Sequence, residues 1–119
     1  MANILLIEDN EQNRYLTTFL LEYYGHTVLA ATDGAAGIAL AQTAHPALIL
    51  LDIQLPGMDG YAVAEALRQD AALAGTPIVA VTSYAMVGDR ERILAAGCNG
   101  YIEKPINPAT FVDEIAKFL

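Results

Sequence analysis

The sequence predicts a doubly wound α/β fold, in which five parallel strands form one sheet between two layers of helices. Strand-like apolar runs alternate five times with helical segments along the 119 residues, and this alternation implies a parallel sheet with right-handed crossovers. The third run, Leu-Ile-Leu-Leu at residues 48–51, has no polar alternation, which is typical of a strand that helices cover on both faces. For five strands we expect the order 2-1-3-4-5, with strands 1 and 3 adjacent where the winding reverses.

Two strand–helix units precede the third strand. Residues 3–7 predict the first strand, and residues 27–31 predict the second. Between them, residues 12–24 are expected to form a helix because their apolar side chains recur with helical spacing, and Gly25 would end it. The apolar side chains in question are Leu16, Phe19, Leu20 and Tyr23. After Asp33 an alanine-rich helix is expected to run to about Ala44.

The second half of the chain continues the same alternation. The third strand ends at Asp52, and a loop with Pro and Gly residues separates it from a helix at residues 60–69 that Asp59 can cap. Asn107 and Pro108 are expected as the N-cap and first position of the last helix. The remaining elements are expected at residues 78–81 (strand), 89–96 (helix) and 100–102 (strand).

The composition restricts the class of protein. Fourteen acidic and six basic residues give a formal charge of −8, which argues against nucleic acid as a partner. No stretch is apolar enough to predict a membrane span, and the N-terminus lacks the basic region of a signal peptide. We therefore expect one cytoplasmic domain over residues 1–119, with the single Cys98 buried and reduced.

Chemically active side chains follow four of the predicted strands. Strand 1 ends in Glu8-Asp9 and strand 3 in Asp52, while Thr82-Ser83 and Glu103-Lys104 follow strands 4 and 5. Parallel strands place these ends on one edge of the sheet, which is where open α/β sheets bind their ligands. We therefore expect the three carboxylates of Glu8, Asp9 and Asp52 to converge, opposite a hydroxyl and an ammonium group.

Three carboxylates in one crevice repel one another unless one is protonated or a cation holds them together. Oxygen ligands without His or Cys favour Mg²⁺ or Ca²⁺ over zinc. Lys104 and Thr82 would suit the oxygens of a phosphoryl group. The combination indicates Mg²⁺-dependent phosphoryl transfer onto Asp52, which would give an aspartyl phosphate.

Each of these residues also has an ordinary structural explanation. Asp52 could be a turn residue, and Glu8 and Asp9 could stabilise the N-terminus of the first helix through its dipole. Lys104 could be a surface lysine, and Thr82 a β-branched strand residue. The functional interpretation depends on all four strand ends carrying complementary groups at once.

At these positions the chain resembles the receiver domains of two-component response regulators, over essentially its whole length. Their flavodoxin-like (βα)5 fold agrees with the predicted element order. The runs around residues 82–86 and 95–101 are most similar to stand-alone regulators and to the receivers of hybrid histidine kinases. The motifs that carry the resemblance are Ile7-Glu8-Asp9-Asn10, the run from Leu51 to Gly60, Val81-Thr82-Ser83 and Glu103-Lys104-Pro105.

The resemblance implies a role for each site residue. Asp52 would accept a phosphoryl group from a phosphohistidine of a partner. Lys104 would pair with one phosphoryl oxygen, and Thr82 would move to hydrogen-bond another. Asp9 and Asp52 would ligate Mg²⁺ directly, Glu8 through water, and Gln54 through its main-chain carbonyl. Tyr101 matches the family's aromatic switch, although it could equally be an aromatic packed at the sheet edge. The resemblance also implies a cis Lys104–Pro105 bond.

These inferences predict a signalling switch or relay without an output domain of its own. The expected partners are a histidine kinase or histidine phosphotransfer protein, which would dock on the first helix near Asn13 and Arg14, and a downstream protein that binds the fourth helix, fifth strand and fifth helix. The chain could be a monomer or a phosphorylation-dependent dimer. Gln54 and Tyr84, two residues past Asp52 and Thr82, could tune the lifetime of the phosphate.

Alternative functions have weaker support. The chain could be a receiver excised from a hybrid histidine kinase. A Mg²⁺-dependent aspartyl-phosphate phosphatase would usually carry a second Asp where this chain has Gln54. A flavodoxin-like ligand module would need a neutral phosphate-binding loop where Glu8-Asp9-Asn10 stands.

Overall fold

The computed structural model describes residues 2–83 and 86–119. Strands and helices alternate along the chain, with one short 3₁₀ helix, η1, in the second half. The strands are β1 (Asn3–Ile7), β2 (Thr27–Ala31), β3 (Leu48–Asp52), β4 (Ile78–Thr82) and β5 (Gly100–Glu103). The helices are α1 (Glu11–Tyr23), α2 (Gly34–Ala44), α3 (Gly60–Gln69), η1 (Ala71–Leu73), α4 (Val87–Ala95) and α5 (Phe111–Ala116).

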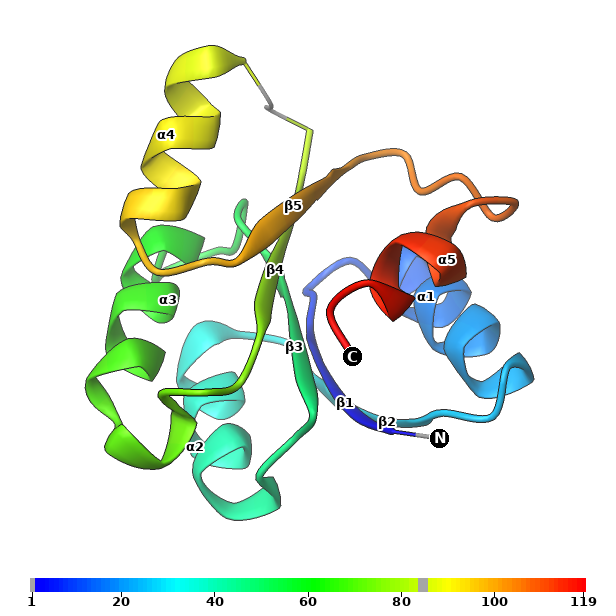
Figure 1. Ribbon diagram of the computed structural model, residues 1–119, viewed down its shortest axis with the longest axis horizontal. Helices are drawn as coiled ribbons and strands as arrows, with labels where there is room; N and C mark the ends of the chain where they lie inside the picture. Colours follow the sequence, from blue (N-terminus) through cyan, green and yellow to red (C-terminus); the bar gives the residue numbers. More distant parts are fainter. Residues whose placement is uncertain (1, 84–85) are drawn as a thin grey trace.

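The strands form one parallel sheet in the order β2-β1-β3-β4-β5. Helices α1 and α5 cover one face of the sheet, and α2, α3 and α4 cover the other (Figure 1). The predicted doubly wound fold and strand order are therefore confirmed. Among the described residues, no helix combines the length and apolar character that crossing a membrane requires.

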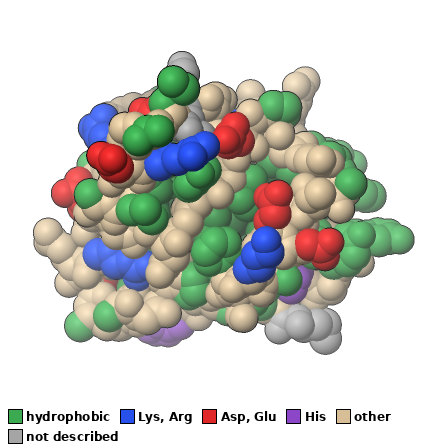
Figure 2. All heavy atoms as spheres, turned by 45° about the horizontal axis from the view of Figure 1, so that its top comes forward, with side chains coloured by type: hydrophobic (Ala, Val, Ile, Leu, Met, Phe, Trp, Pro, Cys, Tyr) green, Lys and Arg blue, Asp and Glu red, His purple; other side chains and the backbone are tan. Residues whose placement is uncertain are grey.

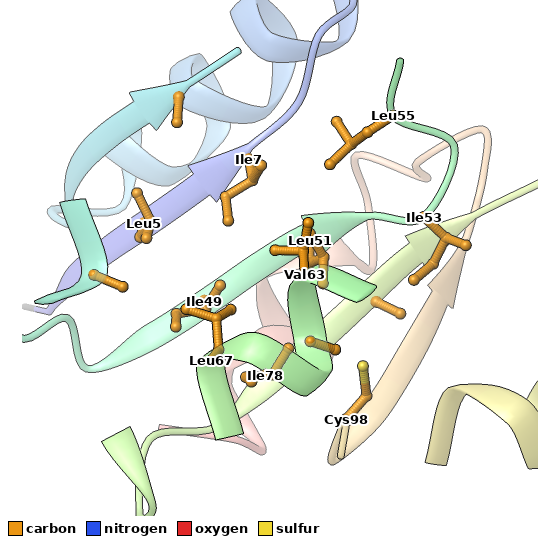
Figure 3. Close-up of a cluster of buried hydrophobic side chains, with 14 of the residues drawn as sticks. Leu5, Ile7, Ile49, Leu51, Ile53, Leu55, Val63, Leu67, Ile78 and Cys98 are labelled. Carbon is orange, nitrogen blue, oxygen red and sulfur yellow. The ribbon is translucent and has the colours of Figure 1, made fainter. Parts of the chain in front are cut away.

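The central strand β3 is buried along its whole length, because alternate side chains enter a different core on each face of the sheet. Leu5 and Ile7 of β1 and Ile49 and Leu51 of β3 pack towards Val63 and Leu67 of α3 (Figure 3). On the opposite face, Ile4, Leu6, Leu48 and Leu50 pack with Leu21 of α1 and Phe111 of α5. This burial on both faces is the physical reason for the unbroken apolar run at residues 48–51.

Capping side chains start α1 and α2 shortly after β1 and β2, and α3 after the loop that follows β3. Asn10, Asp33 and Asp59 each accept a hydrogen bond from a main-chain N–H near the start of α1, α2 and α3. Such caps satisfy N–H groups that would otherwise lack an intrahelical partner. They fix the turns that follow β1, β2 and β3 at the edge of the sheet where the polar residues gather.

Helix α1 differs from expectation in the face that it buries. The expected apolar side chains were those of Leu16, Phe19, Leu20 and Tyr23, but Phe19 is 55% exposed and Tyr23 is 74% exposed. The fully buried side chains of α1 are those of Thr17 and Leu21, and of the expected set Leu20 is half-buried and packs against the core. Spacing alone could not show this, since both sets of residues recur with helical periodicity.

The last helix also begins later than expected. Regular α-helix starts at Phe111 with Thr110 as its N-cap, and not at Pro108. Asn107 still organises this segment, because its side chain accepts from the N–H of Ala109 and its carbonyl accepts from Thr110 and Phe111. Residues 108–110 therefore form a turn that leads into α5. Helix α4 begins two residues before the expected start, and η1 was not anticipated.

Candidate functional site

Three carboxylates meet at the carboxyl edge of the sheet. Because Ile7 of β1 lies opposite Leu51 of β3, the residues that follow, Glu8 and Asp52, become neighbours. Glu8, Asp9 and Asp52 each place a carboxylate oxygen within 4.8 Å of the others. Glu8 and Asp52 are buried, at 3% and 2% exposure, whereas Asp9 is exposed.

Lys104 supplies a positive charge to this cluster. Its Nζ lies 3.1 Å from Asp52 Oδ2 and 3.2 Å from Glu8 Oε1. Its main-chain N–H donates to the carbonyl of Thr82 at 2.8 Å, and the Lys104–Pro105 bond is cis. The side chain thus reaches from the end of the edge strand β5 towards the central strand β3.

The pKa values of Glu8 and Lys104 indicate that the ammonium of Lys104 does not fully compensate the neighbouring carboxylates. Burial, together with the neighbouring carboxylate of Asp52, raises the pKa of Glu8 to about 7. Burial lowers the pKa of Lys104, but the charges of Asp52 and Glu8 outweigh it, so the pKa of Lys104 is raised. One ammonium group does not compensate three carboxylates. Either protonation of Glu8 or a bound cation would relieve the remaining repulsion between Glu8 and Asp52.

The donor set is compatible with Mg²⁺. The cluster offers only carboxylate oxygens, which are hard ligands, and no imidazole or thiolate. The open side of the cluster lies at Asp9, which is the exposed member. This agrees with the preference of Mg²⁺ for sites that leave part of its shell to water or a phosphate.

The loop after β3 folds back tightly against the end of that strand. The N–H of Gly60 donates to the carbonyl of Ile53 at 3.0 Å. A Cβ at Gly60 would lie only 2.4 Å from Ile53 Cα and 2.8 Å from the carbonyl oxygen of Asp52. Only glycine therefore allows α3 to start this close to Asp52.

Thr82 ends β4 beside Asp52, and it is fully buried. Its hydroxyl accepts a hydrogen bond from Gln54 Nε2 at 2.9 Å, and the N–H of Ser83 donates to Gln54 Oε1 at 3.4 Å. The sequence analysis assigned Gln54 a metal role through its main-chain carbonyl and did not predict this side-chain link. Its one visible sign was a long amide side chain two residues past Asp52.

Tyr101 lies apart from the carboxylate cluster. It occupies β5 opposite Ala80 of β4 and is half-buried. The guanidinium of Arg90 in α4 lies 5.3 Å from its ring centroid, and Arg90 also lies 3.9 Å from Glu103. Figure 2 shows acidic and basic side chains next to one another on this side of the molecule, with hydrophobic side chains between them. Tyr84, the other residue expected to influence the site, lies outside the described residues.

Helix α1 is tied to the cluster through Arg14. The Arg14 Nη1 donates to the carbonyl oxygens of Glu8 and Asp9 at 3.1 and 3.2 Å. The start of α1 therefore borders the carboxylates, which agrees with the expected position of Asn13 and Arg14 near the site.

These features define a doubly wound α/β protein with an acidic, lysine-paired crevice at the topological switch point between β1 and β3. The family model described as the response regulator receiver domain matches residues 4–116. The chain belongs to the family of response regulator receiver domains of two-component systems.

Individual relatives agree with this assignment. The polar-differentiation response regulator DivK of Brucella ovis is 41% identical over 117 residues, which cover 98% of this chain and 95% of that protein. Among solved structures, the chemotaxis protein CheY4 of Vibrio cholerae has a TM-score of 0.96 at 29% identity, covering 100% of this chain and 99% of that one. A sensor histidine kinase receiver domain from Pseudomonas aeruginosa, with a magnesium ion coordinated in its active site cleft, has a TM-score of 0.91 at 33% identity and covers 98% of this chain and 96% of that one.

Proposed function

We propose that the chain is a phosphorylatable receiver that accepts a phosphoryl group on Asp52 and acts as a signalling switch or relay. The observation that carries this proposal is the convergence of Asp52 with Glu8, Asp9 and Lys104 at one edge of the sheet. A structural ion pair would need only one carboxylate for the lysine, whereas this crevice collects three.

In the proposed reaction, a carboxylate oxygen of Asp52 attacks the phosphorus of a phosphohistidine on a partner protein. A phosphorus–oxygen bond forms, the phosphorus–nitrogen bond breaks, and the imidazole leaves with a proton. Lys104 neutralises charge on the phosphoryl oxygens, and the Thr82 hydroxyl donates to one of them. Mg²⁺ held by Asp9, Asp52, Glu8 through water and the Gln54 carbonyl would supply the remaining positive charge.

The phosphoryl group would then bias a two-state element that includes Thr82 and Tyr101. We propose that a histidine kinase or histidine phosphotransfer protein docks on α1, and that a downstream protein binds the surface of α4, β5 and α5. We further propose a cytoplasmic protein in which residues 1–119 form one receiver domain, as a monomer or a phosphorylation-dependent dimer. The same chemistry would serve a receiver module of a hybrid histidine kinase, and the Pseudomonas aeruginosa structure is the receiver domain of a sensor histidine kinase.

The test is the intact mass of the protein after incubation with Mg²⁺ and acetyl phosphate. We expect the wild type to gain one phosphoryl group, and the gain should vanish in Asp52→Asn and when Mg²⁺ is omitted. The matched control is Asp59→Asn, which alters a helix cap outside the carboxylate cluster and should leave the gain intact. A gain that persists in Asp52→Asn would contradict the proposed acceptor.

A further inference from the structure

The side chain of Gln54 connects the acceptor strand with the end of the next strand. Its Nε2 donates to Thr82 Oγ1 at 2.9 Å, and its Oε1 accepts from the N–H of Ser83 at 3.4 Å. The main-chain N–H of the same residue donates to Asp52 Oδ1 at 3.0 Å. One residue therefore contacts the Asp52 carboxylate on β3 and the Thr82 hydroxyl on β4.

This contact bears directly on the proposed function, on which the inference rests. In that function the Thr82 hydroxyl donates to a phosphoryl oxygen on Asp52, and it would move away from Gln54 to reach that oxygen. Thr82 is fully buried and Gln54 is half-buried, so water competes only weakly for their hydrogen bond and its loss carries a cost. We call the unphosphorylated structure, with this hydrogen bond formed, the resting arrangement. Because the bond is weakened when the Thr82 hydroxyl moves, it stabilises the resting arrangement relative to the phosphorylated one.

We propose that Gln54 is a positioning residue, whose side chain holds the Thr82 hydroxyl in its resting place and thereby sets the equilibrium between the resting and phosphorylated arrangements. The two ends of the carboxamide have separate tasks. The Nε2 group restrains the Thr82 hydroxyl, while Oε1 anchors the side chain to the main chain at Ser83. Gln54 acts through Thr82 and needs no side-chain contact with the transferred group.

The substitution Gln54→Met tests this role because methionine has a similar length and can make neither hydrogen bond. The measured quantity is the dissociation constant of beryllofluoride, a phosphoryl analogue that is not hydrolysed, in the presence of Mg²⁺. We expect the constant to fall about three- to tenfold, which corresponds to the net contribution of one hydrogen bond. The control is Gln69→Met, the same substitution at the exposed last residue of α3, which should leave the constant unchanged.

A double-mutant cycle separates an effect through Thr82 from a change in access to the crevice. Thr82→Val keeps the shape of the side chain and removes the hydroxyl. In that background, Gln54→Met should change the dissociation constant less than about twofold, because the interaction between the two residues is already absent. An equal gain in both backgrounds would overturn the proposal, since Gln54 would then act independently of the hydroxyl.

A second readout uses the free protein without Mg²⁺ or a phosphoryl analogue. In nuclear magnetic resonance spectra, Gln54→Met should move the Thr82 methyl resonance towards its position in beryllofluoride-bound wild type. An unmoved methyl resonance, or an unchanged or higher dissociation constant in Gln54→Met, would overturn the proposal. If the wild type bound no beryllofluoride, the proposed function would fail. The positioning role would still be tested by Thr82→Val in the free protein. A shift of the Gln54 side-chain amide resonance in that variant would support the role, and no shift would overturn it.

Discussion

Asp52 and Lys104 form an ion pair at the polar edge of the sheet. Asp52 is 2% exposed, and only its partners compensate the cost of removing its charge from water. Among the described residues these partners are the ammonium of Lys104, the main-chain N–H of Gln54 and the carboxyl group of Glu8 when it is protonated. A buried charge with so few partners is a weak way to stabilise a fold, which is why this carboxylate is better explained by chemistry than by stability.

Cys98 gives a prediction for the dependence of stability on pH. Burial raises the pKa of its thiol from 9.0 to about 11, despite the nearby charge of Arg68. The folded state therefore favours the neutral thiol. Its contribution is fully present below pH 9 and is lost as the pH rises towards 11, by about 2–3 kcal/mol in total. We expect Cys98→Ala to gain stability relative to wild type over this interval, as measured by urea unfolding at pH 8 and at pH 10.5.

The difference between the two proteins cancels the titration of tyrosines and lysines that they share. Cys98→Ala itself should be less stable at pH 8, because it leaves a small cavity beside the core cluster of Figure 3. A difference in free energy of unfolding that stays constant from pH 8 to pH 10.5 would contradict the prediction.

At the scale of elements, α1 is the helix whose sequence pattern and buried face disagree most. The rings of Tyr15, Phe19 and Tyr23 stack along its exposed side, with centroids 6.5 and 6.4 Å apart. Tyr15 and Phe19 border a groove that reaches Ala30 of β2 and also includes Arg14. Exposed aromatic rings next to the site fit a protein-docking surface better than a core.

Two substitutions in α1 should therefore destabilise the fold to different extents. Phe19→Ala removes a side chain that is 55% exposed, so we expect a change in the free energy of unfolding below about 1 kcal/mol. Leu21→Ala empties a fully buried position and should cost about 2–5 kcal/mol. Urea unfolding measures both.

For function, we expect Phe19→Ala to affect the docking of a donor protein and not the chemistry at the crevice. Phe19→Ala should slow phosphotransfer from a phosphohistidine donor protein while phosphorylation by acetyl phosphate keeps its wild-type rate. Equal slowing with both donors would mean that Phe19 supports the crevice and not the docking of a protein.

At the scale of the whole molecule, charge is unevenly balanced. The formal charge is −8, and the site gathers three of the carboxylates within 4.8 Å of one another. Net charge of this size lowers the stability of a compact state through self-repulsion. A divalent cation that binds only the folded state should relieve part of this repulsion and stabilise the fold.

We therefore expect Mg²⁺ to raise the thermal unfolding midpoint, with an increase that grows with the logarithm of its concentration above the dissociation constant. NaCl at matched ionic strength controls for general screening. Asp9→Asn should lose most of the Mg²⁺-specific rise, since Asp9 is the exposed member of the cluster and has no ion pair among the described residues. A rise of equal size with NaCl would show screening in place of binding.

The fold and the composition of the site could be predicted from the sequence. The alternation of apolar runs with helical segments determines a parallel sheet. Polar residues directly after those runs share one edge, because parallel strands all end on the same edge of the sheet. Glu8, Asp9, Asp52 and Lys104 could be grouped on this basis alone. Cys98 could be predicted as buried because a lone cysteine in such a chain is usually a small core residue.

Only the tertiary structure decided which of several equally periodic faces is buried and which long side chains reach across strands. In α1 the exposed stack of Tyr15, Phe19 and Tyr23 has the same helical spacing as the buried pair Thr17 and Leu21. Which of the two faces is buried depends on how the helix lies on the sheet. The link from Gln54 to Thr82 joins residues 28 positions apart in the sequence. Its existence depends on the pairing of β3 with β4 and on the turn that begins α3, and neither is visible in local sequence.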